Sequence, residues 1–156
     1  MTFTTPAISI LFGLRESLMM MREEGLPAIF QRHQRIAASF RAAGRALGLR
    51  LLAADPDTAS PAVTALYFPD ALTGEKSDAV LKTWRDLGLV VGEGQGKLAG
   101  KIFRIGHLGS VHEEDVAATV QVLERGLEAN GYPVTRGAAL TAAQRALQSS
   151  EPSLVA

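Results

Sequence analysis

The 156-residue chain contains no cysteine, few aromatic residues and no excess charge of either sign. Without cysteine it cannot form a disulfide, use a thiol nucleophile or bind a metal through thiolates. Its 16 basic residues are balanced by 16 acidic ones, which leaves no broad positive field for nucleic acid or anionic lipid. No apolar run reaches the length of a transmembrane helix. We therefore expect a cytoplasmic protein with no nucleic-acid and no membrane partner.

Helical spacing of apolar residues predicts two helices in the first third of the chain. In the run 7–25 the stripe consists of Leu11, Leu14, Leu18 and Met21. We expect this amphipathic helix to pack on a core, with its methionines filling gaps. A second long helix is predicted over 26–48, after a break at Gly25.

Strands and helices alternate in the rest of the chain. The apolar segments 49–53, 62–68, 89–91 and 101–106 are predicted to be strands. Helices are predicted over 75–88, from Glu113 to Gly131 and over 138–147, with Ser110 and Glu113 at capping-box spacing before the second of these. This order indicates an α+β domain, a small and mostly antiparallel sheet of about four strands with its helices packed on one face. We expect the domain to cover residues 1–150, followed by a disordered tail over 151–156.

Arg104 lies in the middle of an apolar, strand-like run, "AGKIFRIGHLG". Strand alternation sends residues 101, 103 and 105 to one side of the sheet and residues 102, 104 and 106 to the other. A guanidinium on that second side needs an anion, and its planar fork matches a carboxylate, which Gly106 would allow to approach. The alternative is a structural ion pair with an acid such as Asp115 or Glu93.

Other candidate motifs fail on spacing. The run "GEGQGKLAGK" lacks the glycine interval of a nucleotide phosphate loop, and its glycines precede a strand instead of a helix, so we interpret it as a hairpin-like connection. His107 and His112 have no serine or carboxylate at a recognisable triad spacing, which leaves hydrolase chemistry without support. His33 has no second ligand at metal spacing, so no metal site is predicted.

Three segments, in order along the chain, carry a family resemblance: "TTPAISILFGLRESLMMMREEGLPAIFQRHQR", "SPAVTALYFP" and "VGEGQGKLAGKIFRIGHLGSVHEEDV". Together they resemble the C-terminal small domain of class V aminotransferases, most of all the serine–glyoxylate and alanine–glyoxylate branch. The resemblance runs from Thr4 to Gly131, and the later segment "RGAALTAAQRAL" is similar to the tail of the bacterial serine–glyoxylate enzymes.

The resemblance implies a pyridoxal-phosphate-dependent transaminase of fold type I that works as a homodimer and moves an amino group from serine or alanine to glyoxylate. In such enzymes the arginine of the "FRIGH" segment binds the carboxylate of the amino acid or keto acid, a role that falls on Arg104 here. A hydroxyl near the Thr-Pro pair reaches the cofactor phosphate in the neighbouring subunit. Thr4 is the best match for that hydroxyl and Thr5 the second.

The departures from the family concern catalysis. Family members are roughly twice as long or more, and their large domain holds the Schiff-base lysine. None of the lysines here lies in that motif; they are Lys76, Lys82, Lys97 and Lys101. The resemblance thus implies a fragment, a truncated gene product or half of a split enzyme, inactive until a large domain or second chain is supplied.

A non-enzymatic alternative stays open from the sequence. The chain could be a remnant or an interaction module that pairs with another chain through its open sheet face and first helix. If the chain belongs to an enzyme, the residues that choose the amino donor lie largely in the absent large domain.

Overall fold

The computed structural model describes residues 5–55 and 58–149, which fall into two compact units, one up to Arg32 and one from His33 onward. The first unit contains helix α1 (Ile8–Glu24) and the start of helix α2 (Leu26–Ala46). Gly25 separates the two helices at φ 83°, a left-handed conformation that glycine adopts without strain. The break predicted at Gly25 is therefore confirmed.

Helix α1 has no buried side chain. Its predicted stripe is exposed, with Leu11, Leu14, Leu18 and Met21 each at least 41% accessible. The prediction that this stripe and the methionines fill a core is wrong for the described chain. A periodic apolar face identifies the side of a helix that favours burial, but it does not identify a surface that buries it.

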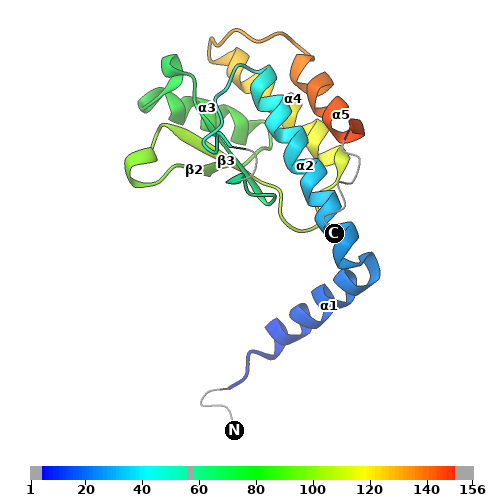
Figure 1. Ribbon diagram of the computed structural model, residues 1–156. Helices are drawn as coiled ribbons and strands as arrows, with labels where there is room; N and C mark the ends of the chain where they lie inside the picture. Colours follow the sequence, from blue (N-terminus) through cyan, green and yellow to red (C-terminus); the bar gives the residue numbers. More distant parts are fainter. Residues whose placement is uncertain (1–4, 56–57, 150–156) are drawn as a thin grey trace. The chain divides into compact units, whose positions relative to one another are not determined.

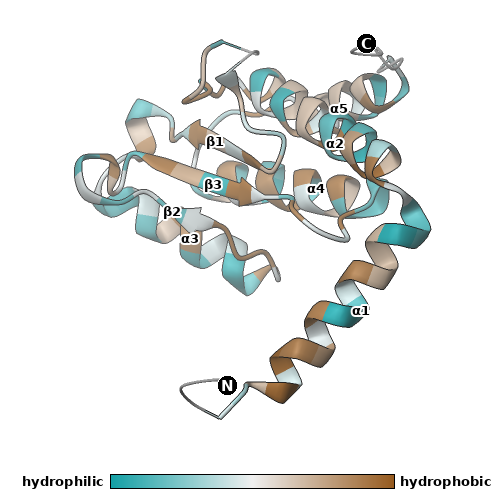
Figure 2. Ribbon diagram, turned by 60° about the horizontal axis from the view of Figure 1, so that its bottom comes forward, coloured by the Kyte–Doolittle hydropathy of each residue, from teal (hydrophilic) through white to brown (hydrophobic). Residues whose placement is uncertain are grey.

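The second unit is built on a small antiparallel sheet. Its strands are β1 (Val63–Tyr67), β2 (Gly92–Glu93) and β3 (Ile102–Gly106), in the spatial order β1-β3-β2. Figure 1 marks β2 and β3, and Figure 2 marks all three strands. The described residues form three strands in place of the four predicted. The remaining helices are α3 (Glu75–Asp86), α4 (Glu113–Ala129) and α5 (Ala138–Ser149).

One face of the sheet carries the hydrophobic core. Phe103 and Ile105 of β3 and Leu66 of β1 join apolar side chains from α2, α3, α4 and α5 in a single buried cluster. In Figure 2 the sheet lies in front of helices α3 and α4, which cover its far face. The predicted α+β class, with helices on one face, is confirmed. In the part of the chain that the structure describes, no helix is both long and apolar enough to cross a membrane.

Two of the predicted strands differ in the structure. The segment 49–53 pairs with β1 only through a bridge between Leu51 and Leu66, flanked by the hydrogen bonds from Leu52 to Ala65 and from Tyr67 to Arg50. The chain then bends away into the turn-rich segment that follows, so no full strand forms. Residues 89–91 are also not a strand, because the pairing with β3 starts one residue later, at Gly92.

The start of α4 is capped two residues later than predicted. His112 has an extended backbone, and its N–H donates to the carboxylate of Asp115 at 2.8 Å. Ser110 and Glu113 therefore do not form the predicted capping box. The same spacing of three residues recurs at His112 and Asp115, where the backbone leaves the extended conformation.

Two tight contacts hold α4 in place. The buried carboxylate of Glu124 accepts hydrogen bonds from the backbone N–H groups of Gly137 at 3.0 Å and Ala139 at 3.1 Å, which anchors the start of α5. On the other side of α4, the indole of Trp84 lies so close to Gly126 that a methyl group there would overlap ring atoms Cδ1 and Nε1.

Candidate carboxylate-binding site

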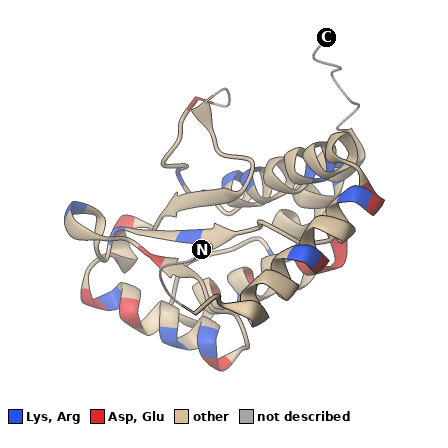
Figure 3. Cartoon of the chain, turned by 90° about the horizontal axis from the view of Figure 1, so that it is seen from below, with Lys and Arg blue, Asp and Glu red and all other residues tan. Residues whose placement is uncertain are grey.

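Arg104 lies on the central strand, with its side chain on the face opposite the core. Its strand neighbours Phe103 and Ile105 are buried in the core cluster, while Arg104 itself is half-buried and Gly106 is exposed. The predicted alternation holds from Phe103 to Gly106, whereas Ile102, on the same side as Arg104, is buried too. In Figure 3 the middle strand of the sheet shows a single basic segment.

The residues beside Arg104 are small. Ala65 of β1 and Gly92 of β2 are its direct partners on the two sides, and Val63 is the partner of Gly106. Directly opposite residues in an antiparallel pair point to the same face. Arg104 is therefore flanked by a methyl group and a bare backbone, which leaves its guanidinium as the main polar group in that row of the face.

The guanidinium is held on one edge and free on another. Its Nη2 atom donates to the backbone carbonyl of Glu93 at 2.9 Å. Its Nε atom is buried and has no hydrogen-bond partner among the described residues. Nη1 forms no hydrogen bond with any described residue. The side chain is therefore fixed in orientation while part of its donor set stays available to an anion.

The structure bears on the ion pairs that the sequence offered as an alternative for Arg104. Among the described residues, no carboxylate forms an ion pair with Arg104. The carboxylate of Asp115 accepts the backbone N–H of His112, and Glu93 contacts Arg104 through its backbone carbonyl. A structural ion pair with either acid is thus absent, and the positive charge is not neutralised within the described part of the chain.

The histidines near this strand lie elsewhere. His107 is fully buried, with Nε2 at 2.9 Å from the hydroxyl of Thr64, on the core side of the sheet. His33 is buried too and accepts the backbone N–H of Gly109 at 3.2 Å. His112 is exposed, and its ring contacts Ser110. Among the described residues, no group of three His, Asp or Glu side chains could hold a metal ion.

A second arginine, Arg50, belongs to the same face but has a different environment. The register of the bridge places it beside Tyr67, and its guanidinium carbon lies 3.5 Å from the centre of that aromatic ring. This cation–π contact occupies the flat side of the Arg50 guanidinium. Arg104 has no comparable aromatic contact among the described residues, so it is the stronger candidate to bind a ligand.

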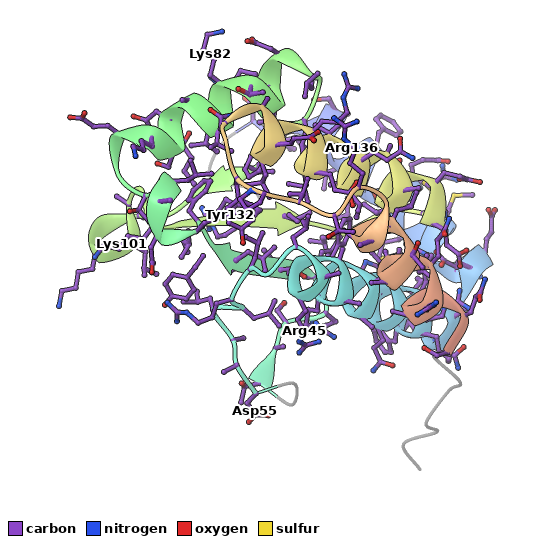
Figure 4. The ribbon with its side chains drawn as sticks, turned by 90° about the horizontal axis from the view of Figure 1, so that it is seen from above. Arg45, Asp55, Lys82, Lys101, Tyr132 and Arg136 are labelled. Carbon is purple, nitrogen blue, oxygen red and sulfur yellow. The ribbon has the colours of Figure 1, made fainter. Side chains whose placement is uncertain are left out.

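The described residues do not form a site for pyridoxal phosphate on their own. Thr4 lies outside the described residues, and Thr5 is an exposed residue ahead of α1 in the first unit. All four lysines are exposed; Lys82 pairs with Asp86 at 2.6 Å, and Figure 4 shows Lys82 and Lys101 pointing outward. None of them lies in a buried position where a Schiff-base lysine would be held.

The sequence did not reveal which backbone groups position Arg104. The Glu93 carbonyl accepts a hydrogen bond from the guanidinium, and the guanidinium occupies the space beside Gly92; neither was predicted. One signal was available, because a glycine at a strand position commonly marks a place where another group approaches the backbone closely.

Most of the chain is similar in sequence to aminotransferases and to a hydrogenase subunit. No protein-family model matches it. It is 46% identical over 147 residues to the soluble hydrogenase small subunit of Synechococcus, covering 94% of this chain and 37% of that protein. It is 39% identical over 148 residues to the serine–glyoxylate aminotransferase of Arabidopsis thaliana, covering 95% and 36%.

The fold of the chain is also similar to part of a solved aminotransferase structure. The crystal structure of pyridoxamine–pyruvate aminotransferase from Mesorhizobium loti matches 95% of this chain and 38% of its own, with a TM-score of 0.87 and 31% identity. The chain is therefore similar to one part of these aminotransferases. It spans little more than a third of the length of the relatives named here.

The hydrogenase name is that relative's own and is not carried over to this chain.

Proposed function

We propose that this chain is the substrate-carboxylate-binding part of a pyridoxal-phosphate-dependent aminotransferase that moves an amino group from serine or alanine to glyoxylate. Arg104 binds the carboxylate of the amino acid or keto acid. The observation that carries this proposal is the guanidinium held on one edge by the Glu93 carbonyl, with Nη1 free and no carboxylate paired with it in the described chain.

The chemistry of the donor set fits this role. A small monocarboxylate presents two oxygens in a plane, which a fixed guanidinium binds with matched geometry. Ala65 and Gly106 leave room beside the cation for such a small acid. When serine is the donor, its amino group ends on glyoxylate as glycine and the remaining carbon skeleton leaves as hydroxypyruvate.

The cofactor and its Schiff-base lysine would come from a part that this chain does not contain. The relatives are nearly three times as long as the segment they share with it. We propose that the chain acts only together with such a large domain, in an enzyme that is a homodimer, and that Thr4 or Thr5 contributes a hydroxyl toward the cofactor phosphate.

A chimeric enzyme tests the proposal. The segment of the Arabidopsis serine–glyoxylate aminotransferase that matches this chain would be replaced by the chain itself, and serine-to-glyoxylate transfer measured. We expect activity, and we expect Arg104→Lys to raise the KM for glyoxylate by about tenfold or more, because a point charge replaces a planar fork. Arg85→Lys, an exposed arginine on α3, is the matched control. An active chimera in which Arg104→Lys leaves the KM unchanged contradicts the proposal.

A second candidate function rests on the exposed apolar side chains of α1. Helices with such a face commonly pack on another protein surface, so the chain could be an interaction module that pairs with a second chain without any cofactor. The two functions differ in a size measurement of the chain mixed with a separately expressed large domain. Association that strengthens with pyridoxal phosphate supports the enzyme, and association indifferent to it supports the module.

A further inference from the structure

The guanidinium of Arg104 lies across strand β2, directly over a glycine. A Cβ atom added to Gly92 would lie 3.4 Å from Nε of Arg104 and 3.5 Å from both its Cβ and its Nη2. The arginine side chain therefore fills the space into which a side chain at position 92 would extend. A methyl group there would be in ordinary van der Waals contact with the arginine, whereas a β-branched side chain such as valine would place two further carbon atoms beside it.

The residue after this glycine supplies the polar contact. The Glu93 carbonyl accepts the hydrogen bond from Nη2 at 2.9 Å, while Nε is buried against β2 without a partner. A hydrogen bond from a charged group is stronger than a neutral one, so this contact fixes the plane of the guanidinium. Nη1, at the end of the side chain, forms no hydrogen bond with β2 or with any other described residue.

Although β2 is only two residues long, the loop after it is firmly attached. The N–H of Gly94 donates to the Ile102 carbonyl at 3.1 Å, and a Cβ at Gly94 would overlap the carbonyl of Leu98. At the far end of the loop, the Gly100 carbonyl accepts the N–H of Gly74, which precedes α3, at 2.9 Å. The support beneath Arg104 is therefore held by backbone contacts at both ends.

We propose that Gly92 is a positioning residue for Arg104. Its missing side chain lets the guanidinium lie across β2, where the Glu93 carbonyl holds it with Nη1 free to meet a ligand carboxylate. The effect on substrate binding rests on the proposed function, whereas the orientation itself can be measured in this chain alone.

The orientation is tested by hydrogen exchange of the Arg104 Nε–H in the 156-residue chain, followed by ¹⁵N nuclear magnetic resonance. The signal is assigned by its loss in Arg104→Lys. We expect Gly92→Val to speed exchange with water by about tenfold or more, because Nε leaves its buried position and Nη2 loses its hydrogen bond. An unchanged exchange rate in folded Gly92→Val overturns the proposal.

The matched control is Gln95→Val, which places the same β-branched side chain in the loop directly after β2. Gln95 is exposed and extended, with φ −123° and ψ 152°, so it accepts valine without strain. Its Arg104 exchange rate should equal that of the unaltered chain. If Gly92→Val does not fold, Gly92→Thr replaces it, since threonine has the same shape and a hydroxyl suited to this exposed position; an unchanged rate there overturns the proposal equally.

The chimeric enzyme separates this proposal from the proposed function. If both hold, Gly92→Val raises the KM for glyoxylate by about tenfold or more, in the same direction as Arg104→Lys, while Gln95→Val does not. If Gly92→Val speeds exchange but neither it nor Arg104→Lys changes the KM, the positioning role stands and the carboxylate role fails. If Arg104→Lys raises the KM and Gly92→Val changes neither readout, the positioning role fails alone.

Discussion

The Nε2 atom of His107 lies 2.9 Å from the hydroxyl oxygen of Thr64, across the pair of strands β1 and β3. The imidazole is fully buried and stacks on Phe40, with ring centroids 5.3 Å apart. Burial, and after it the positive charge of Arg41, lowers the pKa of His107 to about 4. The residue is therefore neutral in the folded protein at pH 7, and it belongs to the core on the side of the sheet away from Arg104.

We predict that the chain loses stability in mild acid because of His107. An unfolded histidine has a pKa of about 6.5, so the unfolded state binds more protons and stability falls as the pH drops from about 6.5 toward 4. The loss amounts to about 3 kcal/mol over this range. Urea unfolding at a series of pH values measures it. His107→Gln should flatten the dependence, whereas His112→Gln, at an exposed position, should retain it.

We predict that Glu124→Gln destabilises the chain by about 1–3 kcal/mol. The carboxylate accepts two backbone N–H groups at the start of α5, and an amide offers only one oxygen, so one N–H would face another donor. Thermal unfolding provides the measurement. Glu128→Gln is the control on the same helix, because its ion pair with Arg136 is at the surface, where such pairs contribute little to stability. Equal effects of the two changes would show that burial of Glu124 is not what matters.

We predict that Gly126→Ala destabilises the chain by about 1–3 kcal/mol, since the methyl group must displace the indole of Trp84. Trp84 is the chain's single tryptophan, so the displacement should also shift its fluorescence maximum. Gly13→Ala is the matched control in α1, where an added Cβ meets nothing within 4 Å. That change should leave the fluorescence unaltered; a shift in Gly13→Ala, or none in Gly126→Ala, contradicts the assignment of this contact.

The elements predicted well are those set by local backbone geometry. The helix break at Gly25 follows from the freedom of glycine at positive φ, and the face of Arg104 follows from the two-residue repeat of a strand. Helix α3 begins at Glu75, as its apolar spacing predicted. Each of these depends on residues close together in the chain.

Features that depend on pairing between residues far apart in the chain could not be predicted. The segment 49–53 has the composition of a strand, but it pairs with β1 at one bridge before the chain bends away. The partner of Arg104 was sought among carboxylates, and the structure supplies a backbone carbonyl instead. Which carbonyl reaches a side chain depends on the register between β2 and β3, and the two exposed residues of β2 carry no hydrophobic pattern that would specify this register.

Because β3 is the central strand, Arg104 cannot change its position in the sheet without disrupting the packing of the domain. β3 is paired along both edges, so it cannot slide without breaking two ladders at once. A slip by one residue would turn Phe103 out to water and drive the arginine charge into an apolar interior, two penalties that add. Any adjustment toward a bound acid must therefore come from rotation about the bonds of the arginine side chain while the strand itself stays still.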